Sequence, residues 1–324
     1  QSLTNRMGGH VMNIKEAIHL YLSYKESLGE KIRDVRYLLL RFERYINPIV
    51  ELDEIKETDC QNFLNCKGRK NNNYTRYWDY QFCKLERFFV WAFSRKFIHS
   101  IPLPKIRPTI RHDFTPYIYS TDELNKIFAT ALCYRQRYNI EYPYVIQTML
   151  KLTYCLGLRS GETTRLLVED IDLNNDLLYI NETKFHKSRL VTANAPVMKM
   201  LKLYLDWRKS IVKENHFVNN HLFLDKRGNG VPQHELQQAF RLICTKANIV
   251  RKDGKNVRLH DLRHSFATHR LVKWYKEGAD VQTLLPVLST YLGHSHLEDT
   301  SIYLSMTHEL LDKANIRFKT YVES

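Results

Sequence analysis

A proline-rich stretch in the first half of the chain limits how it can fold. Four prolines lie between residues 102 and 116, with lysine and arginine among them. Proline fixes φ and lacks a backbone donor, so this stretch cannot form a regular helix. We expect an extended basic linker over residues 101–119, joining a helical domain over residues 12–100 to a second domain over residues 120–324. Residues 1–11 would be a flexible leader or a remnant of cloning.

The first domain is predicted to be a bundle of four or five helices that ends near Ile98. Apolar residues recur at helical spacing from residue 13, and a break at Leu28 and Gly29 separates the first two helices. Further helical patterns cover residues 57–68 and 74–97.

The second domain is predicted to be α+β, so that the whole chain is mainly α with one small antiparallel sheet. Ser120 and Glu123 have the spacing of a capping box, and a later helix is stopped by Gly157. Residues 176–196 alternate like a strand, a polar turn and a returning strand. The remaining expected elements are helices over residues 196–212 and 232–249, a short strand over 221–225, and mostly helix from residue 259. We find no Walker A loop, GxGxxG or internal repeat, which argues against nucleotide-driven chemistry.

The charge of the chain favours a polyanionic partner. Lys and Arg number 49 against 35 Asp and Glu, a formal net charge of +14. No run of about 18 apolar residues is present, so we expect no membrane span. Six cysteines without a CxxC pair indicate reduced thiols in a cytoplasm rather than a zinc ribbon or a disulfide framework.

Basic residues between Cys66 and Arg87 alternate with asparagine, tyrosine and tryptophan. Such a mixture can follow a phosphate backbone, although an ordinary solvated helix face fits the local pattern equally well. The candidate DNA contacts here and in the linker are Lys67, Arg69, Lys70, Arg76, Lys105, Arg107 and Arg111.

The stretch "HDLRHSFATHR" over residues 260–270 raises the question of a metal site. His260 and His264 have the spacing of the zinc motif H-E-x-x-H, but Asp261 replaces the glutamate and Arg263 would repel a dication. His260 and Arg263 instead lie three residues apart on one helical face, an imidazole beside a guanidinium fork that suits phosphate. We therefore favour a phosphate site over zinc.

Two further segments carry residues of the same chemistry. Arg159 follows a glycine-broken helix end, with Glu162 near enough to orient it. Gly293 and His294 lie at a helix junction, and Tyr303 follows nine residues after the histidine.

Taken together and in this order, these motifs resemble the tyrosine recombinases, also called the phage integrase family. The resemblance covers residues 117–307, and the helical first half with its linker looks like the family's core-binding domain. It implies the tyrosine recombinase fold and a site-specific recombinase, from a mobile element, that cleaves and rejoins DNA for integration, excision, transposition or resolution. The implied catalytic residues are Arg159, Lys184, His260, Arg263, His294 and Tyr303.

The resemblance also implies what each residue does. Arg159 and Arg263 would clamp the scissile phosphate, and Tyr303 would attack phosphorus to give a 3′-phosphotyrosyl link and a 5′-hydroxyl. A free phenol has a pKa near 10, so Tyr303 needs help to ionise, and His260 is the candidate acceptor of its proton.

The remaining roles concern the phosphate oxygens. His294 would hydrogen-bond a nonbridging oxygen, and Lys184 would protonate the leaving 5′-oxygen. Lys187 lies in the same expected hairpin and is an alternative to Lys184. We expect His264 to pack against or support its helix.

By resemblance, the reaction is a reversible strand exchange on double-stranded DNA that needs no metal, no ATP and no other cofactor. The protein would be nucleoid-associated in a bacterial cytoplasm and would act as a homotetramer on two duplexes. A tail over residues 308–324 would dock on a neighbouring protomer or pack on its own domain. The alternatives are a catalytically inactive DNA-binding relative and a type IB topoisomerase-like activity that relaxes DNA.

Overall fold

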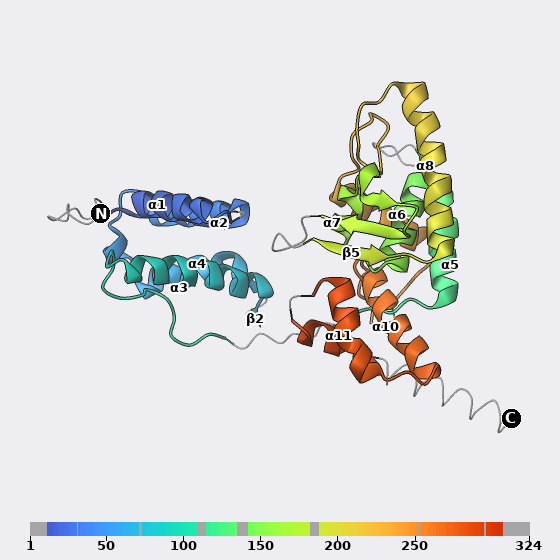
Figure 1. The fold of residues 1–324 in the computed structure, drawn as a ribbon. Helices are drawn as coiled ribbons and strands as arrows, with labels where there is room; N and C mark the ends of the chain where they lie inside the picture. The colour runs from blue at the N-terminus through green and yellow to red at the C-terminus, as the bar shows by residue number, and fades with distance from the viewer. Residues whose placement is uncertain are drawn as a thin grey trace. The chain divides into compact units, whose positions relative to one another are not determined.

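The chain divides into two compact units, residues 1–114 and residues 115–324, and the division falls inside the proline-rich stretch (Figure 1). This is a computed structural model, and the residues that it describes are 12–30, 32–70, 73–108, 115–134, 142–181, 188–251, 253–294 and 296–306. None of the described helices is long and apolar enough to cross a membrane.

The first unit is a small helical bundle. An aromatic core that includes Phe42, Phe63 and Phe88 joins the helices. The α1 helix ends at Ser27, where Gly29 adopts a φ of +72° and turns the chain as the sequence predicts. The elements are α1 (Ile14–Ser27), α2 (Arg33–Ile46), the 3₁₀ turn η1 (Leu52–Glu54), α3 (Glu57–Gly68), β1 (Arg69–Lys70), β2 (Asn73–Tyr74) and α4 (Arg76–Ser94).

The β1 and β2 strands form an antiparallel pair that the sequence analysis did not predict. The helix expected over residues 74–97 is correspondingly shorter, since Tyr74 lies in β2 and the Thr75 side chain caps α4 by accepting from the Trp78 N–H.

The second unit is mainly helical with a three-stranded antiparallel sheet in the order β3-β4-β5, and the expected fold class is confirmed. Leu178 and Val191 pair across β4 and β5 and are both fully buried, which fixes the face of the sheet that packs on the core. The elements are α5 (Thr121–Leu132), α6 (Pro143–Cys155), α7 (Ser160–Arg165), η2 (Val168–Asp170), β3 (Ile171–Asp172), β4 (Leu177–Ile180), β5 (Arg189–Thr192), α8 (Ala195–Asn215), α9 (Gln233–Lys246), α10 (Asp261–Lys276) and α11 (Val281–Leu292). Residues 298–306 are helical as well.

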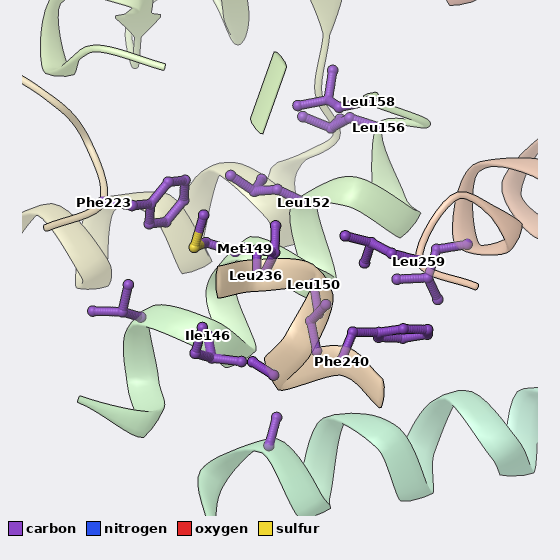
Figure 2. Packing of buried hydrophobic residues seen from close by; sticks show 14 of the residues in the cluster. Ile146, Met149, Leu150, Leu152, Leu156, Leu158, Phe223, Leu236, Phe240 and Leu259 are labelled. Atoms are coloured by element: carbon purple, nitrogen blue, oxygen red, sulfur yellow. The ribbon is translucent and has the colours of Figure 1, made fainter. Parts of the chain in front are cut away.

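The α6 helix lies in the middle of this core, as Figure 2 shows. Its apolar side chains Ile146, Met149 and Leu150 are fully buried and belong to the same cluster as Leu236 and Phe240 of α9. Close packing around α6 fixes the position of its C-terminal end, and Arg159 lies in the turn that follows this end.

The prediction of a regular strand over residues 221–225 is wrong. This segment makes only the isolated bridges Leu167 to His221 and Leu224 to Gly230. The Asp225 carboxylate accepts hydrogen bonds from the backbone N–H groups of Arg227 and Asn229, so the chain turns before a ladder can form. The β3 strand was not predicted.

Candidate active site

Arg159 is held where α6 ends and α7 begins. Gly157 has a φ of +61°, which turns the chain, and Arg159 is the N-cap residue of α7. Glu162 accepts from the Arg159 backbone N–H at 2.9 Å and from its guanidinium at 2.8 Å. The other end of the guanidinium donates to the Gly293 carbonyl oxygen at 2.7 Å. The predicted orientation of Arg159 by Glu162 is therefore present, and Arg159 also reaches the turn that precedes His294.

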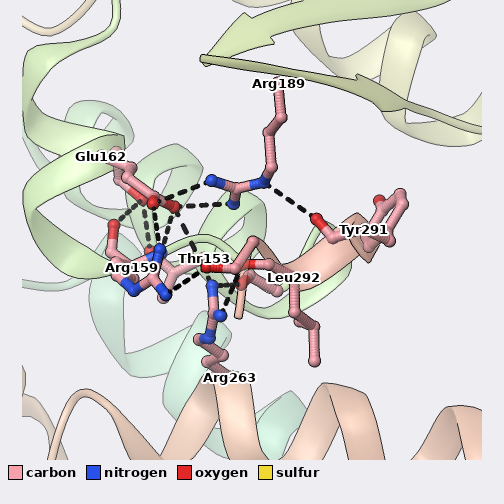
Figure 3. A network of polar contacts seen from close by, with 10 residues as sticks. Thr153, Arg159, Glu162, Arg189, Arg263, Tyr291 and Leu292 are labelled. Carbon is pink, nitrogen blue, oxygen red and sulfur yellow. Dashed lines mark hydrogen bonds and ion pairs between the residues drawn. The ribbon is translucent and has the colours of Figure 1, made fainter. Parts of the chain in front are cut away.

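Arg189 on β5 is part of the same network, although the sequence analysis did not single it out. Its guanidinium donates to both carboxylate oxygens of Glu162 at 2.9 and 2.8 Å, and to the carbonyl oxygen of Tyr291 at 2.9 Å (Figure 3). The one signal in the sequence was its place at the start of the returning strand, five residues after Lys184.

Arg263 is almost completely buried, with its side chain 1% exposed. It donates to the Gly157 carbonyl oxygen at 2.8 Å and to the Leu292 carbonyl oxygen at 2.6 Å, and it lies 3.9 Å from Glu162. Burial and the nearby Arg159 charge lower its pKa to about 9. One buried carboxylate thus supports a cluster of three arginines.

Tyr303 belongs to the helical residues 298–306 and is 1% exposed. Burial raises its pKa to about 12, and the charges of Arg263 and Arg159 offset only part of that effect. Its hydroxyl lies 2.9 Å from Nδ1 of His264, the histidine to which the sequence analysis gave only a supporting role. The expectation for His264 was incomplete, because helical spacing does not reveal which distant segment packs on a face.

His260 and His264 form an edge-to-face pair with ring centroids 4.7 Å apart. His260 is the exposed N-cap residue of α10, whereas Arg263 points inward, so the two residues do not share one exposed surface. Among the described residues, no group of three or more His, Cys, Asp or Glu side chains is placed to hold a metal ion.

His294 follows α11, whose C-cap residue Gly293 has a φ of +69°. Its Nδ1 lies 2.7 Å from the hydroxyl of the fully buried Thr300, and its ring faces Tyr303 at a centroid distance of 6.3 Å. Burial and the charges of Arg263 and Arg159 lower the pKa of His294 to about 3, so the ring is neutral at pH 7.

The composition of the cluster favours an anion as its ligand. Arginines, neutral histidines and a tyrosine from five separate segments are joined by these contacts, and this combination suits a phosphodiester rather than a metal. In the comparison with known proteins, the model of the Phage integrase family matches residues 120–309. The chain belongs to the phage integrase family, the tyrosine recombinases.

This tyrosine recombinase is similar to a curated relative over nearly its whole length, and it shares its fold with solved structures. It is 33% identical over 304 residues to "Putative integrase/recombinase y4rE" of Sinorhizobium fredii, with 92% of this chain and 94% of the relative covered. It shares its fold with XerH site-specific recombinase bound to palindromic difH substrate in a post-cleavage complex (TM-score 0.64, 22% identity, 94% and 85% covered). The fold of a lambda integrase dimer bound to a COC′ core site is also similar (TM-score 0.65, 17% identity, 88% and 96% covered).

Some of the predicted residues of the recombinase lie outside the described parts of the chain. These are Lys184, its alternative Lys187, the tail over residues 308–324, and Arg111 among the candidate DNA contacts.

The other candidate DNA contacts lie in the first unit. Lys67, Arg76 and Lys105 are exposed. Arg107 is exposed too, but it forms an ion pair with Asp79 at 2.5 Å. For Arg69 and Lys70 only the backbone is described, in β1.

Proposed function

We propose that this tyrosine recombinase cleaves and rejoins double-stranded DNA at specific sites through a 3′-phosphotyrosyl intermediate and a 5′-hydroxyl. The observation that carries the proposal is the position of Tyr303, whose hydroxyl contacts His264 and whose ring faces His294, beside arginines anchored on Glu162. The structural neighbours, a recombinase and an integrase bound to their DNA sites, support the same conclusion.

Arg159 and Arg263 would bind the nonbridging oxygens of the scissile phosphate. The Arg159 side chain is 27% exposed, whereas Arg263 donates to main-chain carbonyls, so Arg159 would meet the phosphate first. Positive groups fixed in advance stabilise the charge that develops on these oxygens, and losing one such group costs roughly 10²- to 10³-fold in rate.

Tyr303 would be the nucleophile. A bond forms between its hydroxyl oxygen and phosphorus, the bond from phosphorus to the 5′-oxygen breaks, and the tyrosine proton leaves towards the pair His260 and His264. Lys184, or Lys187 in its place, would donate a proton to the 5′-oxygen. The phosphotyrosyl link keeps the energy of the broken bond, so rejoining needs neither ATP nor a metal.

His294 would donate a hydrogen bond to a nonbridging oxygen. The Thr300 hydroxyl can donate to Nδ1, which would place the ring proton on Nε2. The neutral ring would then point a donor at the phosphate, and Thr300 would set the direction of that donor.

The partners of the recombinase would be recombination sites in duplex DNA and further copies of the chain. Strand exchange joins ends from two duplexes, so it needs one active site for each strand cut and rejoined, and we propose a homotetramer on two duplexes. The family and its neighbours support an origin in a mobile element, with the DNA that flanks the gene as the first substrate to test.

The decisive experiment traps the covalent link. A suicide duplex of the flanking DNA, nicked next to the site, should give a protein–DNA adduct with the wild type and none with Tyr303→Phe. Tyr154→Phe is the matched control, because Tyr154 also contacts a histidine of α10 at 3.0 Å but lies outside the arginine cluster. An adduct with Tyr303→Phe would disprove the assigned nucleophile.

A second measurement separates the alternatives. A recombinase exchanges strands between two marked duplexes, a topoisomerase relaxes supercoils without exchange, and an inactive DNA-binding relative binds without forming the adduct.

A further inference from the structure

The proton of the nucleophile has a specific neighbour. The Tyr303 hydroxyl lies 2.9 Å from Nδ1 of His264, within hydrogen-bond distance. A group that takes a proton must lie within hydrogen-bond reach of it, and His264 meets that condition.

The surroundings of His264 keep its ring neutral. Burial, together with the charges of Arg258 and Arg263, lowers its pKa to about 3, and His260 and His294 are the other titratable groups that face it or act on it. A neutral imidazole has one unprotonated ring nitrogen, and in the tautomer with its proton on Nε2 the nitrogen that accepts from the phenol is Nδ1.

Without DNA the proton stays on Tyr303, because burial raises the pKa of the tyrosine and lowers the pKa of the histidine. A phosphate anion in the arginine cluster would make this proton transfer from Tyr303 to His264 easier in two ways. Its negative charge raises the proton affinity of the histidine, and bond formation to phosphorus removes the negative charge that would build on the phenol oxygen. The proton would therefore leave Tyr303 only once a phosphodiester is in place.

We propose that His264 is a catalytic residue that takes the Tyr303 proton onto Nδ1 as the hydroxyl oxygen attacks phosphorus, and returns it when the strand is rejoined. His260, exposed and edge-on to His264, is then the outer member of the pair on the solvent side. This inference rests on the proposed function of Tyr303 as nucleophile.

The same helix carries a natural comparison. His269 of α10 contacts the hydroxyl of Tyr154 through its own Nδ1 at 3.0 Å, and burial lowers its pKa as well. That pair has the same contact chemistry, but it is not part of the arginine cluster. A purely structural role for histidine–tyrosine pairs predicts equal effects from changing either histidine.

The test is the single-turnover rate of adduct formation on the suicide duplex. His264→Asn keeps an amide near the position of Nδ1 but cannot take up a proton, and we expect it to be slower by roughly 10²- to 10⁴-fold with DNA affinity unchanged. His269→Asn should form the adduct at close to the wild-type rate.

Fluorinated tyrosine at position 303 distinguishes proton transfer to His264 from mere positioning of Tyr303 by His264. A more acidic phenol needs less help in losing its proton, so it should restore much of the rate lost in His264→Asn. Adduct formation by His264→Asn at the wild-type rate, or a slow rate that the fluorinated tyrosine leaves unchanged, would overturn the inference. A wrong assignment of the nucleophile would give a different result from a wrong role for His264. In that case Tyr303→Phe would form as much adduct as the wild type, whatever residue stands at position 264.

Discussion

Arg189 donates two hydrogen bonds to Glu162, and this contact joins strand β5 to the first turn of α7. The carboxylate is 1% exposed and also holds Arg159, so one carboxylate ties strand β5 to the arginine that we propose to bind the phosphate. The third donor of Arg189 reaches the carbonyl of Tyr291 and adds the end of α11 to the same network. Strand β5, the start of α7 and the end of α11 are thereby held together by one guanidinium.

Arg189→Lys tests this relationship. A lysine cannot reproduce the two parallel hydrogen bonds of a guanidinium, so we expect adduct formation to slow by about 10²-fold through misplacement of Arg159. Arg208→Lys is the control, because Arg208 is also buried but its hydrogen bonds go to the carbonyl oxygens of residues 219, 221 and 222. Equal rates for the two variants at matched DNA saturation would contradict a positioning role for Arg189.

Glu162→Gln should make the stability of the protein less sensitive to acid. Burial by itself would raise the pKa of this carboxyl, but Arg189 and Arg159 outweigh it and lower the pKa from 4.5 to about 2. A lowered pKa means that the contribution to folding is complete above about pH 4.5 and is lost as the pH falls towards 2, and it corresponds to roughly 3 kcal/mol.

Urea unfolding of both forms at several pH values measures this effect. The gap in unfolding free energy between wild type and Glu162→Gln should be widest above about pH 5 and should narrow in acid. A gap that stays constant down to about pH 3 would show that the charge of Glu162 does not stabilise the fold.

Gly157→Ala should destabilise the second unit. The backbone has a φ of +61°, and an added Cβ would lie 2.5 Å from the Phe266 ring and 2.9 Å from Leu292. Left-handed strain and crowding together predict a loss of about 2–5 kcal/mol. Gly254→Ala is the control, since Gly254 has a φ of +67° with no atom within 4 Å of its added Cβ. Similar unfolding free energies for both variants would rule out the crowding.

Thr300→Val should reduce cleavage more than stability. Valine has nearly the same shape but cannot donate to Nδ1 of His294, so the ring loses the partner that directs its other nitrogen. We expect adduct formation to fall by about 10- to 100-fold, and Thr300→Ser to restore it. A valine variant that cleaves normally would mean that the threonine does not orient His294.

The sequence by itself determined the local features of this protein. Ser120 and Glu123 form the predicted capping box, Gly157 ends α6, and Glu162 reaches Arg159 three residues away. These outcomes depend on backbone conformation and on contacts within one helical turn, which nearby residues control. The proline-rich stretch likewise interrupts the helices through the geometry of its own residues.

Only the tertiary structure decided which distant groups meet. Arg189 reaches Glu162 across 27 residues, and His264 reaches Tyr303 across 39. Helical spacing assigns a side chain to a face of its helix, but the packing of other elements decides what that face contacts. For this reason the motif of residues 260–270 pointed to the phosphate chemistry, whereas the choice of His264 as the partner of Tyr303 required the folded core.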